Sequence, residues 1–212
     1  MRKTSLNRRE MLESCIVKGL LIAGVPMSSP NLLALWQKTE AEAAKPTPED
    51  VLGPFFKKGA PNLAKLRAEG DPGVPLKVTG NIVNSRGEPV HWAQVDLWQA
   101  DHNGRYDIKG YRYRTKLDTQ SSAKYEVETV MPGHYADRPA QHIHYLISAP
   151  GHKTLVTQLY FATDPFFEGD LDKNYGKRSI VKNRELIKPV VLYEQPGVAH
   201  AAVKFDICLE KA

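Results

Sequence analysis

Residues 141–149 read QHIHYLISA, and this short segment is the most informative part of the chain. It is a run of strand-forming residues, so it predicts a β-strand. Side chains alternate between the two faces of a strand, and His142 and His144 are therefore expected to share one face. Two imidazoles at this spacing suit two ligands of a single metal ion.

Two tyrosines could supply further ligands to that ion. Tyr135 lies in the turn that precedes the strand, and Tyr106 follows a turn at Gly104. Two nitrogens combined with two hard, anionic phenolate oxygens favour a trivalent cation such as Fe(III) over Zn²⁺, which usually takes Cys, His or carboxylate. The residue types therefore predict a non-haem Fe(III) centre with four ligands, namely Tyr106, Tyr135, His142 and His144.

Strand patterns also dominate the rest of the chain from residue 75 onward. Short segments of this kind are separated by turn signals, and they lie at 76–82, 90–99, 125–129, 141–149, 154–161, 186–193 and 202–209. No long helical period follows residue 50. We predict an all-β fold, an antiparallel β-sandwich of about seven to eight strands with long loops, preceded by a short export or helical segment. Trp92 and Trp98 are expected in its core.

Length and charge narrow the class of protein further. A chain of 212 residues fits one domain with a short appendage, and a domain of this size needs no disulfide bonds. The net charge of +5 is not gathered into a basic run with interleaved aromatic residues. Nucleic-acid binding therefore has little support.

The first 44 residues have the pattern of an export signal. Arg8 and Arg9 precede a moderately apolar stretch at 16–35, and small residues at 41–43 offer a cleavage site. This resembles a twin-arginine signal and predicts a periplasmic or secreted protein. A lysine and two prolines interrupt the apolar stretch, so no stable membrane span is expected after processing. The alternative is a basic amphipathic helix that stays attached.

The motifs of the chain resemble those of the intradiol ring-cleavage dioxygenases, non-haem Fe(III) enzymes that include catechol and protocatechuate dioxygenases. The resemblance covers about residues 50–166, and the motifs follow the order in which the family has them. They are Gly53-Pro54-Phe55-Phe56, Gly80 to Ala93, Trp98-Gln99-Ala100-Asp101, Gly104-Arg105-Tyr106, Pro132-Gly133-His134-Tyr135, Arg138 to Tyr145, and Thr157 to Phe161 followed by Asp164-Pro165.

The resemblance implies roles for individual residues. It gives the same four iron ligands, and it implies that Tyr135 is the ligand that a chelating catecholate displaces. Arg138 matches an arginine that stabilises charge on the substrate during attack by O2. Gln158 matches a glutamine that helps to position this arginine, although an ordinary strand hydrogen bond would also explain it. Tyr135, Arg138 and Gln158 are thus the expected catalytic residues.

The implied activity is intradiol cleavage of a catechol-type ring with O2, which gives a muconate-type dicarboxylate. The expected partners are a small catechol-type substrate and O2, and a homo-oligomer is possible.

We place the signal segment and linker at 1–44 and the dioxygenase-like domain at 45–212, with 45–50 read as linker. Protocatechuate, catechol, hydroxyquinol and lignin-derived catechols all stay open as substrates. Loop 108–120 is where specificity would vary.

Two details differ from the usual family pattern. Only six residues separate Tyr135 from His142, and Gln141 stands directly before the first histidine.

Two other classes of protein also stay open. A non-catalytic β-sandwich binding module could have the same fold. A cupin-like metalloenzyme also uses His-x-His on a strand, but cupins usually have a carboxylate ligand a few residues later, and 145–149 contains none.

Overall fold

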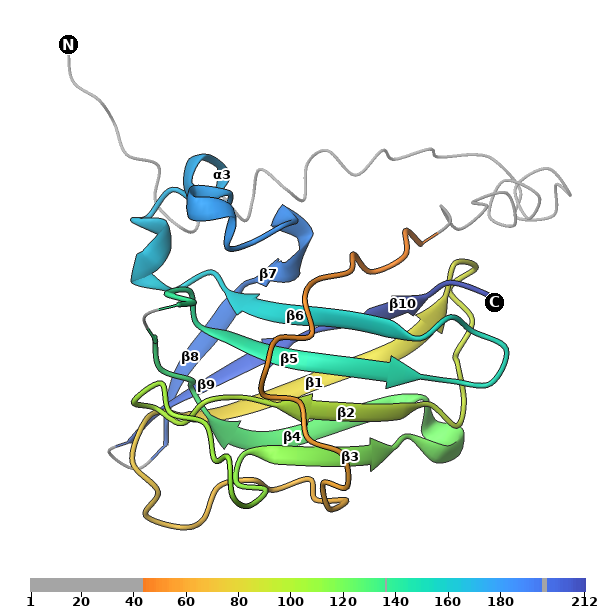
Figure 1. Cartoon of the computed structure of the whole chain (residues 1–212), viewed down its shortest axis with the longest axis horizontal. Helices are drawn as coiled ribbons and strands as arrows, with labels where there is room; N and C mark the ends of the chain where they lie inside the picture. The colour runs from red at the N-terminus through yellow and green to blue at the C-terminus, as the bar shows by residue number, and fades with distance from the viewer. Residues whose placement is uncertain (1–43, 136, 196–197) are drawn as a thin grey trace, which may run out of the picture. The chain divides into compact units, whose positions relative to one another are not determined.

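The computed structural model describes residues 44–135, 137–195 and 198–212, so the predicted export segment lies outside the described part. Two five-stranded sheets stack on each other (Figure 1). One sheet contains β1 (Pro75–Asn84), β4 (Lys124–Val130), β8 (Val190–Gln195), β9 (Val198–Lys204) and β10 (Ile207–Leu209). The other contains β2 (Gln94–Trp98), β3 (Arg114–Asp118), β5 (His142–Ser148), β6 (Leu155–Phe161) and β7 (Ile187–Lys188). The predicted β-sandwich is confirmed.

The helices in the described part are all short. They are η1 (Gln120–Ser122), η2 (Pro165–Phe167), α3 (Leu171–Asn174), η3 (Lys177–Ser179) and η4 (Arg184–Leu186). Most of them lie in the connection from β6 to β7. None of the helices that the structure describes is long and apolar enough to cross a membrane.

The sheets are mixed, and they contain more strands than the sequence pattern indicated. β1 runs parallel to β9 and β10, and β6 runs parallel to β7, while the other ladders are antiparallel. The predicted segment 186–193 divides at Pro189, which cannot donate a ladder hydrogen bond. The segment 202–209 divides near Asp206, whose carboxylate accepts a hydrogen bond from the backbone of Asn81. β3 was not predicted, because its sequence RTKLD is mostly charged.

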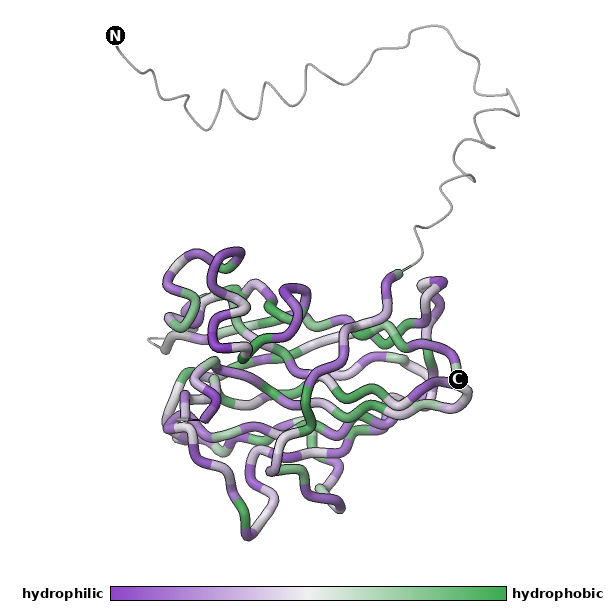
Figure 2. Tube along the Cα trace, turned by 45° about the horizontal axis from the view of Figure 1, so that its top comes forward, coloured by the Kyte–Doolittle hydropathy of each residue, from purple (hydrophilic) through white to green (hydrophobic). Residues whose placement is uncertain are grey.

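The core lies between the two sheets. Most of the core residues belong to strands, and Figure 2 shows hydrophobic green stretches within the folded body of the chain. Ile143, Tyr145 and Ile147 of β5 point into the core, so the alternating residues His142 and His144 face the outer side of their sheet. The two histidines are nevertheless buried, and another part of the chain must therefore cover that outer face.

The two tryptophans have different positions. Trp98 is buried as predicted, with 2% of its surface exposed. Trp92 is 62% exposed and has a positive φ of 60°, so its prediction as a core residue was wrong. It lies in the turn before β2, where the alternation of the strand does not yet apply.

A segment that we call the strap, residues 44–63, covers the outer face. It crosses the sheet from β6 through β5 and β2 to β3, and Figure 1 draws it in orange. At one end the Asp50 N–H donates to the carbonyl of Val156, and at the other the Leu63 N–H donates to Thr115. Residues 45–50, which were read as a linker, are therefore docked against the folded domain.

Candidate metal centre

Strand register gathers the candidate side chains on the face beneath the strap. In the ladders of β5, Trp98 and Gln158 lie directly opposite His144, one on each side. Tyr160 lies opposite His142 in the same way. Because opposite residues of neighbouring strands share a face, all five side chains point toward the strap.

The four predicted ligands come together around the Nε2 atom of His142. This atom lies 3.1 Å from Nε2 of His144, 3.2 Å from the phenol oxygen of Tyr135 and 3.5 Å from that of Tyr106. The two tyrosines belong to different loops, one between β2 and β3 and the other between β4 and β5. The fold thus brings together side chains from three separate segments of the chain.

Close contact between these two loops requires a glycine. Gly104 has a φ of +78°, and a Cβ added there would overlap the carbonyl of His134. A side chain at this position would force apart the loops that carry Tyr106 and Tyr135. The turn at Gly104 is therefore part of what places the two phenols together.

The hydrogen bonding of His142 fixes its tautomer. Its Nδ1 lies 2.7 Å from the carbonyl of Ala140, and a carbonyl only accepts, so Nδ1 carries the proton. The lone pair of Nε2 then faces the phenol oxygens and His144. Histidine ligands of metal ions in proteins usually have this arrangement, in which the other ring nitrogen donates to a carbonyl or carboxylate.

Burial shifts the pKa values of all four groups toward their neutral forms. It lowers the pKa of His142 to about 4 and that of His144 well below its ordinary value, because the cationic imidazolium loses its hydration. Burial likewise raises the pKa of both Tyr106 and Tyr135. At neutral pH both imidazoles are thus neutral, and ionised phenols at this site would need a nearby cation.

These features fit a metal ion. Ligands about 2.0–2.2 Å from one ion are separated from each other by roughly 3.0–3.5 Å. The three distances from His142 Nε2 to the other donor atoms fall in this range. Two nitrogen and two phenol oxygen donors suit Fe(III). Across the described ranges, no group of three or more His, Cys, Asp or Glu side chains is placed to hold a metal. The candidate centre therefore depends on its tyrosines, and the role of the four residues as ligands stays a prediction.

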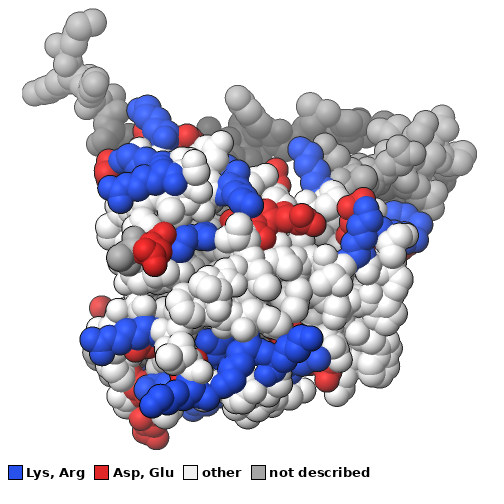
Figure 3. Space-filling model, in the orientation of Figure 1, with Lys and Arg blue, Asp and Glu red and all other residues white. Residues whose placement is uncertain are grey.

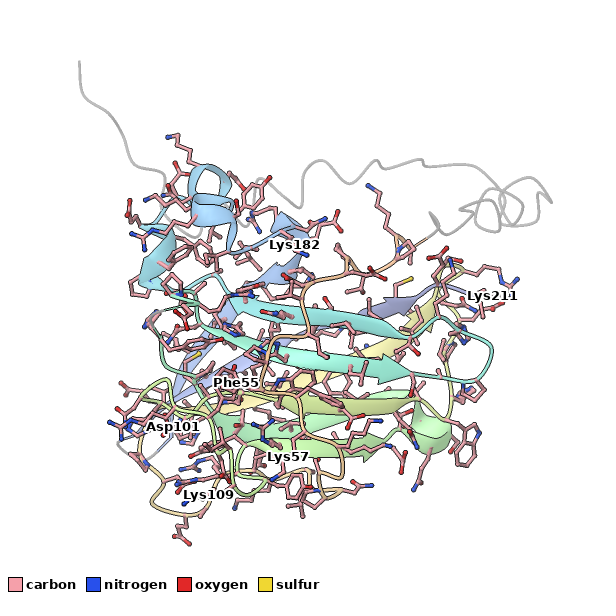
Figure 4. The ribbon with its side chains drawn as sticks, viewed as in Figure 1. Phe55, Lys57, Asp101, Lys109, Lys182 and Lys211 are labelled. Atoms are coloured by element: carbon pink, nitrogen blue, oxygen red, sulfur yellow. The ribbon has the colours of Figure 1, made fainter. Side chains whose placement is uncertain are left out.

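Aromatic rings support the candidate ligands. The Trp98 ring stacks on His144, with 5.0 Å between centroids and 2° between planes. Phe55 of the strap stacks on Tyr106 at 4.1 Å and meets Tyr135 edge-on at 6.2 Å. Figure 4 labels Phe55, which lies beside β5 and β2. The strap therefore covers both phenols with a single ring.

Arg138 and Gln158 lie together, as the resemblance implied. The guanidinium Nη2 of Arg138 donates to the Gln158 side-chain oxygen at 2.9 Å and to the Tyr160 hydroxyl at 2.6 Å. The extra residue Gln141 does not prevent this contact, because its side chain donates to the carbonyl of Pro132. Sequence reasoning missed Tyr160, although its position two residues after Gln158 on the same strand face could have indicated it.

Asp164 was also missed. Its buried carboxylate accepts a hydrogen bond from the ring of His134 at 2.8 Å and from the backbone N–H of Gln141 at 2.6 Å. One carboxylate thus fastens both ends of the loop that holds Tyr135 and leads to His142. The half-exposed ring of His134 therefore anchors this loop.

A buried guanidinium lies close to Tyr106. Arg114 is 2% exposed, and it donates to the carbonyls of Phe55 and Asp107. Its carbon Cζ lies 5.9 Å from the centroid of the Tyr106 ring. Figure 3 adds that basic side chains form a band along the lower part of the face that the strap crosses. The electrostatic potential around the centre therefore favours anionic groups.

The predicted loop 108–120 contains strand β3, and its loop part before that strand has two further tyrosines, Tyr111 and Tyr113. The Tyr111 hydroxyl donates to the carbonyl of Lys58 in the strap, and the ring lies 4.5 Å from the Lys57 ammonium. Tyr113 is buried and its hydroxyl donates to Asp71. Both tyrosines thus anchor loops, and their hydroxyls already have hydrogen-bond acceptors.

Comparison with known proteins gives consistent matches. A family model described as "Dioxygenase" matches residues 51–211. Chlorocatechol 1,2-dioxygenase of Rhodococcus opacus is 29% identical over 195 residues, which cover 77% of this chain and 72% of that protein. Catechol 1,2-dioxygenase 2 of Acinetobacter lwoffii is 31% identical, and the match covers 72% of this chain but only 65% of that protein.

A solved structure matches over its whole length. It is the dioxygenase domain of a dioxygenase and carbohydrate-binding protein fusion from Streptomyces sp. SirexAA-E, with a TM-score of 0.67 and 32% identity. The match covers 79% of this chain and 100% of that chain. The 3-chlorocatechol 1,2-dioxygenase structure from Rhodococcus opacus shares the fold, with a TM-score of 0.66 and 21% identity.

Proposed function

This chain belongs to the intradiol ring-cleavage dioxygenase family, and on that premise we propose that it opens the ring of a catechol-type substrate with O2. The product would be a muconate-type dicarboxylate. The observation that supports this most directly is the meeting of two imidazoles and two phenols within 3.5 Å of His142 Nε2. Neither a cupin-like enzyme nor a non-catalytic binding module has a comparable observation in its favour.

We propose that Tyr106, Tyr135, His142 and His144 hold a ferric ion. When bound, this ion would supply Lewis acidity toward a catecholate and would draw electron density from its ring. His142 offers an unprotonated Nε2, and neutral His144 places its own Nε2 3.1 Å away. The Phe55 ring packs against both phenols from the side of the strap.

Tyr135 and Arg138 have the clearest roles toward the substrate. The Tyr135 oxygen lies 3.2 Å from His142 Nε2, and as a phenolate on the bound ion it would accept a proton from a catechol hydroxyl. Arg138 carries a fixed positive charge that Gln158 and Tyr160 hold in place through Nη2. Such a preorganised cation would stabilise negative charge that builds up on the substrate during attack by O2.

The test combines composition, colour and turnover. We expect the purified protein to contain about one iron per chain, to absorb visible light through tyrosinate-to-iron charge transfer, and to change colour when a catechol is added. Oxygen uptake should be measured with a panel of catechol, protocatechuate, hydroxyquinol and lignin-derived catechols, with the products identified by chromatography.

Two variants make this test specific. Tyr106→Phe should lose the colour and most of the iron, because one ligand is removed while the ring that Phe55 stacks on is kept. Tyr193→Phe is the matched control, since this tyrosine stacks on His200 in the other sheet. A colourless, iron-free protein without oxygen uptake on any of these substrates would overturn the proposal.

We also propose that the protein is exported. The support is the arginine pair Arg8-Arg9 ahead of a moderately apolar stretch, in a segment outside the described residues. Fractionation of a bacterial host with a twin-arginine pathway should find the protein outside the cytoplasm. An Arg8→Lys/Arg9→Lys variant should stay inside, whereas export of that variant would contradict the proposal.

A further inference from the structure

The strap brings a buried carboxylate to the back of the arginine site. Asp50 is 7% exposed, although it lies in a segment whose prolines and charged residues suggested a linker. Its backbone N–H donates to the carbonyl of Val156, and the Thr157 hydroxyl of β6 donates to the carbonyl of Pro48. These contacts fix Asp50 beside the outer face of β6.

The carboxylate of Asp50 contacts the Tyr160 hydroxyl. Oδ2 of Asp50 lies 3.1 Å from that oxygen, and Tyr160 is fully buried. The same hydroxyl oxygen lies 2.9 Å from the Gln158 side-chain oxygen and 3.2 Å from the carbonyl of Ile180. It also accepts a hydrogen bond of 2.6 Å from Arg138. A single hydroxyl proton therefore has three possible acceptors.

Hydrogen-bond accounting assigns this proton to Asp50. The two hydrogens of Arg138 Nη2 go to its nearest acceptors, the Tyr160 hydroxyl at 2.6 Å and the Gln158 oxygen at 2.9 Å, so the Gln158 oxygen already has a donor. The Ile180 carbonyl lies 3.3 Å from the same nitrogen. Oδ2 of Asp50 has one donor within the described residues, which is the Tyr160 hydroxyl. A buried carboxylate oxygen without a donor is costly, and charged acceptors form the stronger hydrogen bonds. The proton thus points to Asp50 and leaves the oxygen lone pairs for Arg138.

The strap also orients Gln158. The Gln158 amide nitrogen donates to the carbonyl of Val51, which is the residue after Asp50, at 2.6 Å. This contact determines which end of the amide is the nitrogen, so the side-chain oxygen faces Arg138. Two neighbouring strap residues therefore orient the two groups that accept hydrogen bonds from the Arg138 guanidinium.

We propose that Asp50 is a positioning residue for Arg138. Its carboxylate accepts the hydrogen bond of the Tyr160 hydroxyl and thereby turns the lone pairs of that oxygen toward the guanidinium. Among the hydrogen bonds of the described residues, the Asp50 carboxylate meets none of the four candidate ligands. The inference rests on the proposed function, because it assigns Arg138 its role in the reaction.

The experiment compares Asp50→Ala with Asp50→Asn in the full-length, iron-loaded protein. Removing a hydrogen-bond partner that orients a group at an active site typically costs about tenfold or more in activity, so we expect Asp50→Ala to lower kcat by about tenfold. KM, iron per chain and the visible band should stay close to wild type, because the ligands are untouched. The thermal midpoint should fall by only a few degrees, because the Tyr160 hydroxyl keeps Gln158 and Ile180 as acceptors. Asp50→Asn keeps an acceptor oxygen and should recover most of the lost kcat.

Two further variants separate a positioning role from general damage. Tyr160→Phe keeps the buried ring and should lower kcat as Asp50→Ala does. Because Asp50 acts through that hydroxyl, the double variant should be no slower than Tyr160→Phe alone. Glu49→Gln is the matched control, since Glu49 is the exposed neighbouring acid in the strap, and it should leave kcat unchanged.

The outcomes distinguish this inference from the proposed function. A wild-type protein without colour or oxygen uptake would defeat the proposed function, and the variants would not be compared. With an active wild type, unchanged kcat in Asp50→Ala would overturn the role of Asp50. The same holds if iron or thermal stability falls in proportion to activity, or if the double variant loses the product of the two single losses.

Discussion

The indole ring of Trp98 lies parallel to the imidazole of His144, with 5.0 Å between centroids and 2° between planes. The two residues are direct partners in the ladder between β2 and β5, so register alone places their rings on one face. The strap approaches His144 as well, because a Cβ built on Gly53 would lie 3.0 Å from its Cε1. A candidate ligand is thus fixed in orientation by a strand neighbour and by the strap.

Replacing Trp98 should destabilise the protein and the centre together. Trp98→Ala removes a buried ring, and such changes cost about 3–5 kcal/mol of unfolding free energy. Trp98→Phe keeps part of the stack and should cost less. Urea denaturation of the metal-free protein measures the unfolding free energy. Iron content after purification measures how well the centre still binds the metal. Iron content equal to wild type in Trp98→Ala would show that the stack does not orient His144.

Gly53 and Gly87 offer a matched pair for testing the contact of the strap with His144. They have nearly equal φ values of +73° and +74°, so alanine should be strained by about 1 kcal/mol at either site. Only the Cβ at position 53 meets the imidazole, whereas the one at 87 has nothing within 4 Å. We expect Gly53→Ala to lose iron and Gly87→Ala to keep it. Equal iron content in the two variants would show that the contact of the strap with His144 does not affect iron binding.

Asp164 should control the loop that carries Tyr135. Asp164→Ala leaves the His134 ring and the half-buried N–H of Gln141 without their acceptor, at a cost of about 2–4 kcal/mol. Asp164→Asn keeps an acceptor oxygen and should be milder. Chemical denaturation measures the loss of stability, and the tyrosinate band should shift because the Tyr135 loop is no longer tied at both ends. An unshifted band would mean that the loop is held by other contacts.

The buried histidines predict a pH dependence of stability for the metal-free protein. Burial lowers the pKa of His142 to about 4, whereas an unfolded chain has about 6.5. Below pH 6.5 the unfolded state binds a proton that the folded state does not, so stability falls as the pH falls toward 4. The loss from His142 alone is roughly 3 kcal/mol, and His144 adds in the same direction.

Chemical denaturation between pH 7.5 and pH 4 checks this expectation. A His142→Gln variant should show a shallower slope over that window, because one of the two buried imidazoles is gone. The same slope in the variant and the wild type would contradict the assignment.

The sequence by itself determined whatever depends on the local period of the chain. Alternation in 141–149 placed His142 and His144 on one face, and turn residues marked most of the strands. The order of motifs indicated the family and the pairing of Arg138 with Gln158. The charged strand β3 was missed because no apolar alternation distinguishes it, and Trp92 was misplaced because it precedes the strand proper.

Only the tertiary structure decided how separate segments meet. Tyr106 lies 36 residues before His142, and sheet register together with the close approach at Gly104 is what brings its phenol to the imidazole. No periodic pattern in the sequence marks where the strap docks. The position of Asp50 behind Tyr160 therefore could not be read from the sequence. A strand pattern specifies which face a side chain takes, but the segment that covers that face is chosen by long-range packing and hydrogen bonding.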